Sequence, residues 1–316
     1  MSRKILLIRL SSLGDLVILS SVLELLKGNE VYLATYSHFA GLYEHDSRLR
    51  EIIRIPRPYG LSDIVRIVKE IRSQNFDYVF DLQRKVLSII LAGLSGATHR
   101  AFYDNRRRER LRALRTKQIK EVPVYELYAA PIKKALGIDL PTPCPKLESV
   151  PIELELPERY IVVAPGAKHE TKVWPYFGEF VQMFREKFPE IEVVAVGGAE
   201  DRRFLDGFSG QVVDMVGRTT IPELLKVIEK SKLVVSNDSA PMHIGAAYGV
   251  PTIGIFGPTV PEFGFRPCNA RIIEVKGLEC RPCSLHGSTA CPLKHFKCMR
   301  NIKPETVLKA AEEMLE

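Results

Sequence analysis

The stretch SNDSAPMHIGAAYGVPTIGIFGPT, residues 236–259, decides the fold. The apolar residues 233–235 precede it and predict a buried strand that runs into the polar turn NDS. A proline then opens a short helix rich in small residues, and a second apolar strand follows at residues 252–256. Strand, helix and strand within about thirty residues are typical of one unit of a parallel α/β sheet.

The polar turn of this unit fits two interpretations. The backbone N–H groups from Ser239 onward lie at the start of a helix, where the helix dipole favours an anion such as phosphate. Asp238 and Ser239 are also ordinary N-capping residues, which need no ligand. The turn alone therefore leaves both interpretations open.

Strands and helices alternate along most of the 316 residues, of which 46% are hydrophobic. In the first half we expect strands at 4–9, 31–34, 51–55, 78–81 and 100–102, and helices at 15–27, 61–73, 86–94 and 124–136. In the second half we expect strands at 160–164 and 192–196 and helices after Pro175 and at 222–230. Residues 140–157 hold five prolines, which disfavour both helix and central strand and indicate a linker.

This alternation predicts an α/β protein with two doubly wound, Rossmann-like domains and a cleft between them. The expected parts are a first domain at 1–145, a proline-rich linker at 146–158, a second domain at 159–303 and a C-terminal helix at 304–316 that packs back on the first domain. Apolar runs are interrupted within about ten residues, too short to cross a bilayer. The N-terminus also lacks the pattern of a signal peptide, so we expect a cytoplasmic protein.

The first strand-to-helix turn is RLSSLGD, residues 9–15. It lacks the GxGxxG pattern, which removes the main support for a nicotinamide or flavin site. Gly14 lets the backbone approach a ligand closely, and Asp15 stands where ligands of open α/β sheets bind. Ser12 and Asp15 also have the spacing of a capping box, which would be structural only.

The loop PGAKHETKVWP, residues 165–175, carries two lysines and a threonine between a strand and a helix. Lysine suits a diphosphate because its ammonium group is a mobile point charge. We expect Trp174 to be a packing residue. No DxD stands in a plausible metal position in the second half, so lysine and helix N-termini would have to neutralise a leaving diphosphate.

Three separated stretches now support a family resemblance: KILLIRLSSLGDLVILSSVLELLK at 4–27, PGAKHETKVWP at 165–175, and residues 236–259. With the cysteine-bearing tail, they resemble the bacterial ADP-heptose:lipopolysaccharide heptosyltransferases of glycosyltransferase family 9. The resemblance implies the GT-B fold with its active site in the cleft between the domains. It also implies a heptosyltransferase that moves heptose from ADP-heptose to the lipopolysaccharide inner core, inverting and without a metal.

The resemblance further implies roles for individual residues. Asp15 would be the general base, and Lys172 would join it in catalysis. The donor, an ADP-sugar, would be bound by Thr171, Lys172, Asp238, Ser239, Ala240 and His243. Ser12 and Gly14 would lie on the acceptor side.

A basic block, residues 100–120, holds nine lysines and arginines and two acids, a net charge of +7 that equals the charge of the whole chain. A solvated helix face is the ordinary reading of such a run. Its density favours an anionic partner instead: a phosphorylated lipid, a membrane surface or nucleic acid. Few aromatic residues are interleaved for stacking, so we expect no nucleic acid. We assign Arg106, Arg107 and Arg108 to an anionic acceptor, with peripheral contact at the inner membrane face.

The last cysteines follow the pattern Cys280-x2-Cys283-x7-Cys291-x6-Cys298. The first pair has the ligand spacing of zinc and the second pair does not. We expect no cofactor, with structural zinc at these four residues as the alternative. Two other functions stay open at this point: a different sugar-nucleotide enzyme on the same fold, and a protein that binds nucleic acid or another anionic polymer through the basic block.

Overall fold

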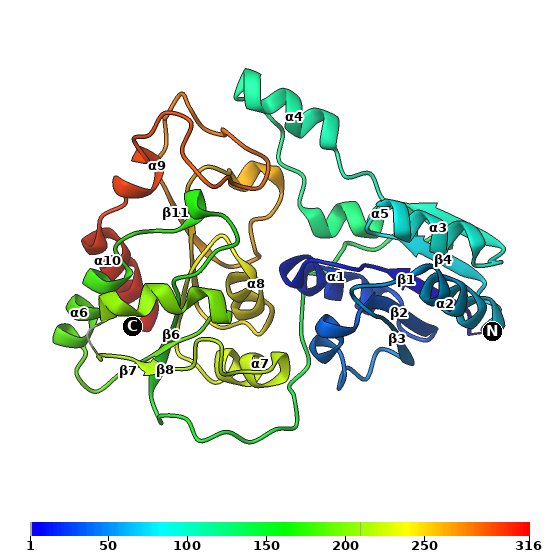
Figure 1. Ribbon diagram of the computed structural model, residues 1–316, viewed down its shortest axis with the longest axis horizontal. Coiled ribbons are helices and arrows are strands. Elements are labelled where there is room, and N and C mark those ends of the chain that lie inside the picture. Colours follow the sequence, from blue (N-terminus) through cyan, green and yellow to red (C-terminus); the bar gives the residue numbers. More distant parts are fainter. Residues whose placement is uncertain (1, 209) are drawn as a thin grey trace. The chain divides into compact units, whose positions relative to one another are not determined.

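The computed structural model describes residues 2–208 and 210–316. The chain forms two compact units. The first comprises Met1–Asn105 and Val124–Glu148, and the second comprises Arg106–Pro123 and Ser149–Glu316. Each unit is a parallel sheet covered by helices, as the alternating sequence pattern predicted (Figure 1). None of the helices in the described part of the chain is long and apolar enough to cross a membrane.

The sheet of the first unit has five parallel strands in the order β3-β2-β1-β4-β5. The strands are β1 (Lys4–Ile8), β2 (Glu30–Tyr36), β3 (Glu51–Ile55), β4 (Tyr78–Asp81) and β5 (His99–Phe102). The helices are α1 (Leu13–Leu25), α2 (Leu61–Ser73), α3 (Val86–Leu94) and α5 (Val124–Leu136), with a 3-10 turn η1 (Ser37–Leu42) after β2.

The helices of the first unit lie on both faces of its sheet. The crossover from β1 to β2 and the crossover from β3 to β4 run in opposite directions, so right-handed connections place α1 and α2 on opposite faces. On one face, α2 and α3 cover a core that includes Ile67, Ile71 and Leu91. On the other face, α1 packs beside α5. Strand β1 is apolar on both sides because both faces of a parallel sheet are buried.

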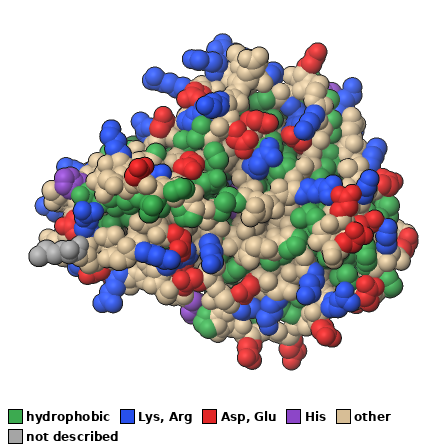
Figure 2. All heavy atoms as spheres, turned by 180° about the vertical axis from the view of Figure 1, so that it is seen from behind, with side chains coloured by type: hydrophobic (Ala, Val, Ile, Leu, Met, Phe, Trp, Pro, Cys, Tyr) green, Lys and Arg blue, Asp and Glu red, His purple; other side chains and the backbone are tan. Residues whose placement is uncertain are grey.

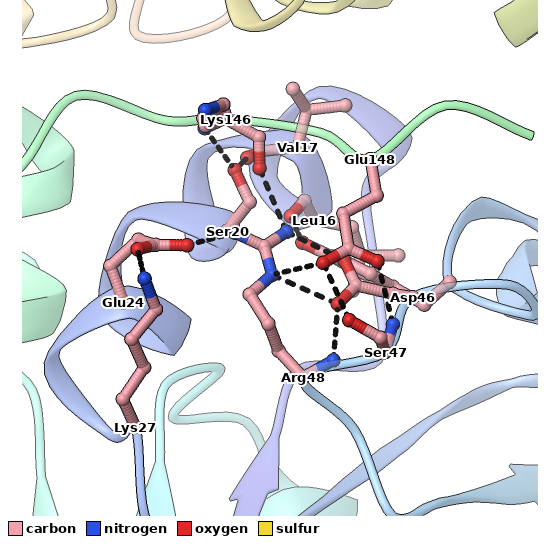
Figure 3. A network of polar contacts seen from close by, with 11 residues as sticks. Leu16, Val17, Ser20, Glu24, Lys27, Asp46, Ser47, Arg48, Lys146 and Glu148 are labelled. Carbon is pink, nitrogen blue, oxygen red and sulfur yellow. Dashed lines mark hydrogen bonds and ion pairs between the residues drawn. The ribbon is translucent and has the colours of Figure 1, made fainter.

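A charged network fixes the end of the first unit at Glu148 (Figure 3). Arg48, a nearly buried side chain, donates to Asp46 Oδ2 at 2.6 Å, to Glu24 Oε1 at 3.0 Å and to the Lys146 carbonyl at 2.8 Å. Glu148 accepts from the backbone N–H of Ser47 at 2.7 Å. We expected the linker to begin at residue 146, but these contacts hold residues 146–148 on the first unit.

The sheet of the second unit has six parallel strands in the order β11-β10-β9-β6-β7-β8. The strands are β6 (Tyr160–Ala164), β7 (Glu192–Ala195), β8 (Val213–Asp214), β9 (Val234–Asn237), β10 (Thr252–Phe256) and β11 (Arg271–Glu274). The helices are α4 (Arg107–Thr116), α6 (Phe177–Lys187), α7 (Ile221–Glu229), α8 (Ala240–Ala247), α9 (Lys297–Arg300) and α10 (Pro304–Leu315). Three 3-10 segments are η2 (Glu170–Lys172), η3 (Ala199–Phe208) and η4 (Pro261–Phe263).

The C-terminal helix α10 belongs to the second unit. Its residues Val307, Ala310 and Ala311 are buried in the same core as Trp174 and strands β6, β9 and β10. We expected this helix to pack on the first domain; in the structure its apolar face completes the core of the second unit. Trp174 is a packing residue, as expected, and its indole N–H donates to the Ile302 carbonyl at 2.9 Å.

The basic block also differs from its prediction. Its residues 107–116 form α4, and residues 106–123 cluster with the second unit and not with the first domain. Lys117 donates to the Pro282 carbonyl at 2.9 Å, and the Arg110 guanidinium lies 5.1 Å from the centre of the Phe265 ring. These contacts explain why residues 106–123 belong to the second unit. Lysine and arginine side chains gather at the upper edge of the face in Figure 2, at the level of α4 in Figure 1.

Candidate active site

Each sheet has one point where the chain reverses its direction of strand addition. In the second unit this point lies between β6 and β9, and in the first unit it lies between β1 and β4. Ligands of open α/β sheets bind beyond the carboxyl ends of the strands at such points. The residues that follow β6, β9 and β1 are the ones to which the sequence assigned chemistry.

Lys172 and Asp238 come together in the second unit. The Lys172 ammonium lies 2.6 Å from Asp238 Oδ2, and the two side chains are only 13% and 10% exposed. The Thr259 hydroxyl donates to the same carboxylate oxygen at 2.7 Å. Three loops, those after β6, β9 and β10, therefore meet on one carboxylate.

The environment keeps Asp238 ionised. Burial by itself would raise its pKa, but the charge and the hydrogen bond of Lys172, the Thr259 hydroxyl and the nearby His243 outweigh burial, so the pKa is lowered. Asp238 is therefore a permanent hydrogen-bond acceptor at neutral pH. The Lys172 ammonium group has two further N–H donors, which can form hydrogen bonds with the oxygen atoms of a diphosphate.

Asn237 fixes the positions of these loops. Its buried amide donates to the Pro165 carbonyl at 2.8 Å, and its carbonyl oxygen accepts from the Trp174 N–H at 3.1 Å. The loop 165–175 is thus held at both ends by the last residue of β9. This rigidity supports a site whose geometry is set before a ligand arrives.

Thr171, which the resemblance assigned to the donor site, is occupied by contacts within the second unit. It is buried, its hydroxyl donates to the Ser288 carbonyl at 3.0 Å, and it accepts from the Ser288 N–H at 2.8 Å. Gly287 has φ +96°, and a Cβ there would lie 2.7 Å from the Cβ of His169. The cysteine-bearing segment therefore packs against the loop that carries Lys172, through Gly287 and Ser288.

Ser239, Ala240 and His243 lie at the start of α8. Ser239 is the N-cap in an extended conformation, and its hydroxyl is 3.1 Å from that of Ser236. His243 is nearly buried in the first turns of the helix. The Ser239 side chain makes no capping hydrogen bond, so the structure does not bear out the capping interpretation. The interpretation that the helix N-terminus faces an anion stays a prediction.

Asp201 is a contact of the Lys172 loop that the sequence analysis missed. A Cβ on Gly166 would lie 2.0 Å from the Asp201 carboxyl carbon, so this carboxylate rests on the glycine of the Lys172 loop. Gly198 N–H donates to Asp201 Oδ2 at 2.9 Å, and burial raises its pKa. Gly197 and Gly198, which follow β7 after one intervening residue, were the signal for a close approach at this position.

Asp15 is the centre of a second polar cluster, in the first unit. Its Oδ2 accepts from Arg9 at 2.8 Å and from the Ser12 hydroxyl and N–H at 2.8 and 3.3 Å. Its Oδ1 accepts from the Tyr128 hydroxyl at 3.0 Å. The capping interaction with Ser12 is therefore present, and Gly14 is buried in the first turn of α1.

The pKa of Asp15 is lowered although the side chain is only 18% exposed. Burial opposes the lowering, and the Arg9 charge and the hydrogen bonds of Ser12 and Tyr128 outweigh it. The sequence analysis missed Arg9 and Tyr128 as partners. Arg9 carried a signal, because a cation that ends a buried apolar strand needs a buried acceptor.

The loop that holds Asp15 is tied to the neighbouring strand. Gln83, just after β4, accepts from the N–H groups of Leu10 and Ser11 at 3.0 and 3.1 Å. Arg9 donates to the Leu82 carbonyl at 2.5 Å. The loops after β1 and β4, between which the first sheet reverses its direction of strand addition, are therefore hydrogen-bonded to each other. Asp15 lies on the β1 side of this point.

The arginines that we assigned to the acceptor are not equivalent. Arg106 has a side chain that is 13% exposed, lies at the N-cap of α4, pairs with Glu109 and donates to the Lys120 carbonyl at 2.9 Å. Arg107 and Arg108 are exposed on α4. Arg106 shapes the helix start, whereas Arg107 and Arg108 are accessible to a ligand.

The four cysteines of the tail are free thiols. Across residues 2–208 and 210–316, no three His, Cys, Asp or Glu side chains converge closely enough to hold a metal ion. Burial raises the pKa of Cys298 to about 11, which favours the neutral thiol. The segment is held to the second unit by backbone hydrogen bonds, of which one runs from the Cys283 N–H to the Pro258 carbonyl at 3.1 Å.

Comparison with known proteins finds lipooligosaccharide and lipopolysaccharide heptosyltransferases among the relatives of this chain. A lipooligosaccharide heptosyltransferase 2 of Campylobacter jejuni is 32% identical over 177 residues, which are 52% of this chain and 54% of that protein. The chain thus spans about half the length of this relative. A lipopolysaccharide heptosyltransferase 1 of Campylobacter coli is 24% identical over 98% of both chains.

A similar solved structure is that of Escherichia coli ADP-heptose lipopolysaccharide heptosyltransferase II. It has a TM-score of 0.76 and 20% sequence identity, and the match covers 99% of this chain and 98% of that one. This likeness shows that the fold is that of a GT-B heptosyltransferase. The family model for glycosyltransferase family 9 (heptosyltransferase) matches residues 64–295, most of the chain, and the chain therefore belongs to glycosyltransferase family 9.

Proposed function

We propose that this chain is a heptosyltransferase that moves heptose from ADP-heptose to the inner core of lipopolysaccharide, with inversion and without a metal ion. The observation that carries the proposal is the Lys172–Asp238 pair at the switch point of the second unit, on loops whose sequences resemble this family. The relatives named above are lipopolysaccharide and lipooligosaccharide heptosyltransferases, which supports the same donor and acceptor class. Family membership also favours this function over nucleic-acid binding by the basic block.

The donor would bind to the second unit. Lys172 and the N-terminus of α8, at Ser239 and Ala240, would neutralise the diphosphate as it leaves. Asp238, which stays ionised, would accept hydrogen bonds from sugar hydroxyls. His243 and Asp201 complete the polar groups at this site, and Thr171 holds the loop through Ser288.

Asp15 would act as the general base. As the acceptor oxygen attacks the anomeric carbon, the bond from that carbon to the diphosphate breaks, ADP leaves, and the acceptor proton passes to the carboxylate. Asp15 Oδ2 already accepts three hydrogen bonds and Oδ1 accepts one, so Oδ1 has room for the proton. The lowered pKa of Asp15 makes it a weak base, which suits a proton transfer late in the reaction.

Arg107 and Arg108 would attract the phosphates and carboxylates of a lipid-linked acceptor, at the inner face of the membrane where that acceptor is made.

Mass spectrometry of lipopolysaccharide from cells with and without this protein tests the proposed function. The proposal predicts a core shortened by one heptose and the sugars beyond it. An unchanged core would refute it.

A further inference from the structure

Helix α3 is apolar on every side. Its sequence is VLSIILAGL, and its single polar side chain, Ser88, is buried and donates to Asp81 Oδ2 at 2.9 Å. Leu87 and Leu91 pack into the core against the sheet. The helix therefore has no polar residue for its outer side, although helices that are hydrophobic all round are normally buried on all sides.

The outer side of α3 is nonetheless exposed. Val86 is 76% exposed and Leu94 is 50% exposed, with Ile89 and Ile90 between them. The neighbouring helix α2 adds Leu61 and Val65. We call these six residues the α2–α3 apolar face. They are half of the twelve large hydrophobic side chains that are exposed in the described chain, so the exposure is clustered and not scattered.

The two segments that carry this face have an excess of positive charge. Residues 84–100, which contain α3, hold Arg84, Lys85 and Arg100 and no acidic residue. Arg84 and Lys85 directly precede the helix, and the Arg100 guanidinium donates to the Gly93 carbonyl at 2.8 Å. Residues 57–73, which contain α2, add four cations and two acids, so the two segments together have a net charge of +5.

An apolar centre with a basic rim matches the interface of an anionic bilayer. Apolar side chains enter the region between headgroups and acyl chains, while lysine and arginine reach the lipid phosphates. A second copy of the chain fits less well, because the positively charged segments that carry the face would repel their counterparts in that copy.

We propose that the α2–α3 apolar face is the surface by which the protein docks on an anionic phospholipid bilayer. The inference rests on the proposed function in one respect: a lipid-linked acceptor brings the enzyme to a membrane. The docking residues belong to α2 and α3 and are distinct from Arg107 and Arg108.

Flotation of the full-length protein with vesicles tests the proposal. Vesicles of phosphatidylethanolamine with phosphatidylglycerol are compared with vesicles of phosphatidylcholine alone. The test variant is Val86→Gln with Leu94→Gln, which keeps helix propensity and alters two exposed positions. The matched control is Leu140→Gln with Leu293→Gln, two exposed leucines outside the face. Unfolding midpoints confirm that all variants are folded.

The wild type and the control should float with the anionic vesicles, and the test variant should bind on the order of tenfold more weakly. Arg84→Gln with Lys85→Gln should lose binding to the anionic vesicles in the same way, because charge attraction contributes. Equal flotation of wild type and test variant overturns the proposal. So does a wild-type dimer that the test variant dissociates, because a second copy would then cover the face.

Transfer to a deacylated, water-soluble acceptor without vesicles separates this proposal from the function. All variants should keep wild-type transfer in that assay, because none of these residues touches the candidate site. If the wild type does not transfer heptose in that assay, the proposed heptosyltransferase function is refuted. The flotation result would still test membrane docking independently.

Discussion

Replacement of Lys172 by methionine removes one charge and keeps most of the side-chain volume. The Lys172 ammonium lies 2.6 Å from a carboxylate that is 10% exposed. Breaking a buried pair from one side costs about 3–5 kcal/mol of the free energy of unfolding, because Asp238 stays buried without its cation. Lys172→Met with Asp238→Asn should recover most of that loss.

The loss of stability should depend on pH. The pKa of Asp238 is held below its ordinary value of 3.8, so its stabilisation is present above that pH and is lost as the pH falls through the lowered value. The stability gap between wild type and Lys172→Met should therefore be constant near neutral pH and close in acid. Urea unfolding at a series of pH values measures it.

The same substitution should weaken ADP binding by about 1.5–3 kcal/mol, the contribution of a charged hydrogen bond. That corresponds to a dissociation constant about 10- to 150-fold higher by calorimetry. Lys168→Met is the matched control, since Lys168 is exposed on the same loop. If Lys172→Met binds ADP within about twofold of wild type, Lys172 is only a structural partner of Asp238 and the donor-site assignment fails.

Three further outcomes follow from the structure. Arg48→Ala should lower the free energy of unfolding by about 3–5 kcal/mol and exposed Arg54→Ala by at most about 1 kcal/mol, and equal urea midpoints would contradict the buried network. Arg107→Ala with Arg108→Ala should raise the acceptor KM, more so at low salt, and leave ADP affinity unchanged; an unchanged KM would make α4 a solvated surface. EDTA should leave turnover unchanged, and strict dependence on Mg²⁺ would show that the leaving diphosphate is neutralised in another way.

The sequence predicted the features that local pattern determines. Apolar strands such as β1 and β9 need both faces buried, so their identity and their parallel pairing follow from composition. The expected ends of these elements lie within one or two residues of the observed ones. Asp15, Lys172 and Asp238 were found because they directly follow such strands or stand on the loops after them.

The features that the sequence did not predict depend on contacts between distant residues. Tyr128 reaches Asp15 across 113 positions, and Ser288 reaches Thr171 across 117. No local pattern encodes either contact. The unit to which α4 belongs is decided in the same way, by the contact of Lys117 with Pro282. The alternation of strands and helices therefore predicted the two sheets. Which further segments pack on each sheet depends on contacts between residues that are distant in the sequence.

The most direct test of the central claim is a transfer assay with purified wild type and Asp15→Asn. Each protein is incubated with ADP-heptose and a lipopolysaccharide inner-core acceptor, and mass spectrometry follows the acceptor and the released ADP. Wild type should give an acceptor with one added heptose and an equal amount of ADP. Asp15→Asn should bind ADP-heptose as wild type does and lose about 10²- to 10⁴-fold in turnover. Near-wild-type turnover by Asp15→Asn, or an unaltered acceptor with the wild type, would contradict the account.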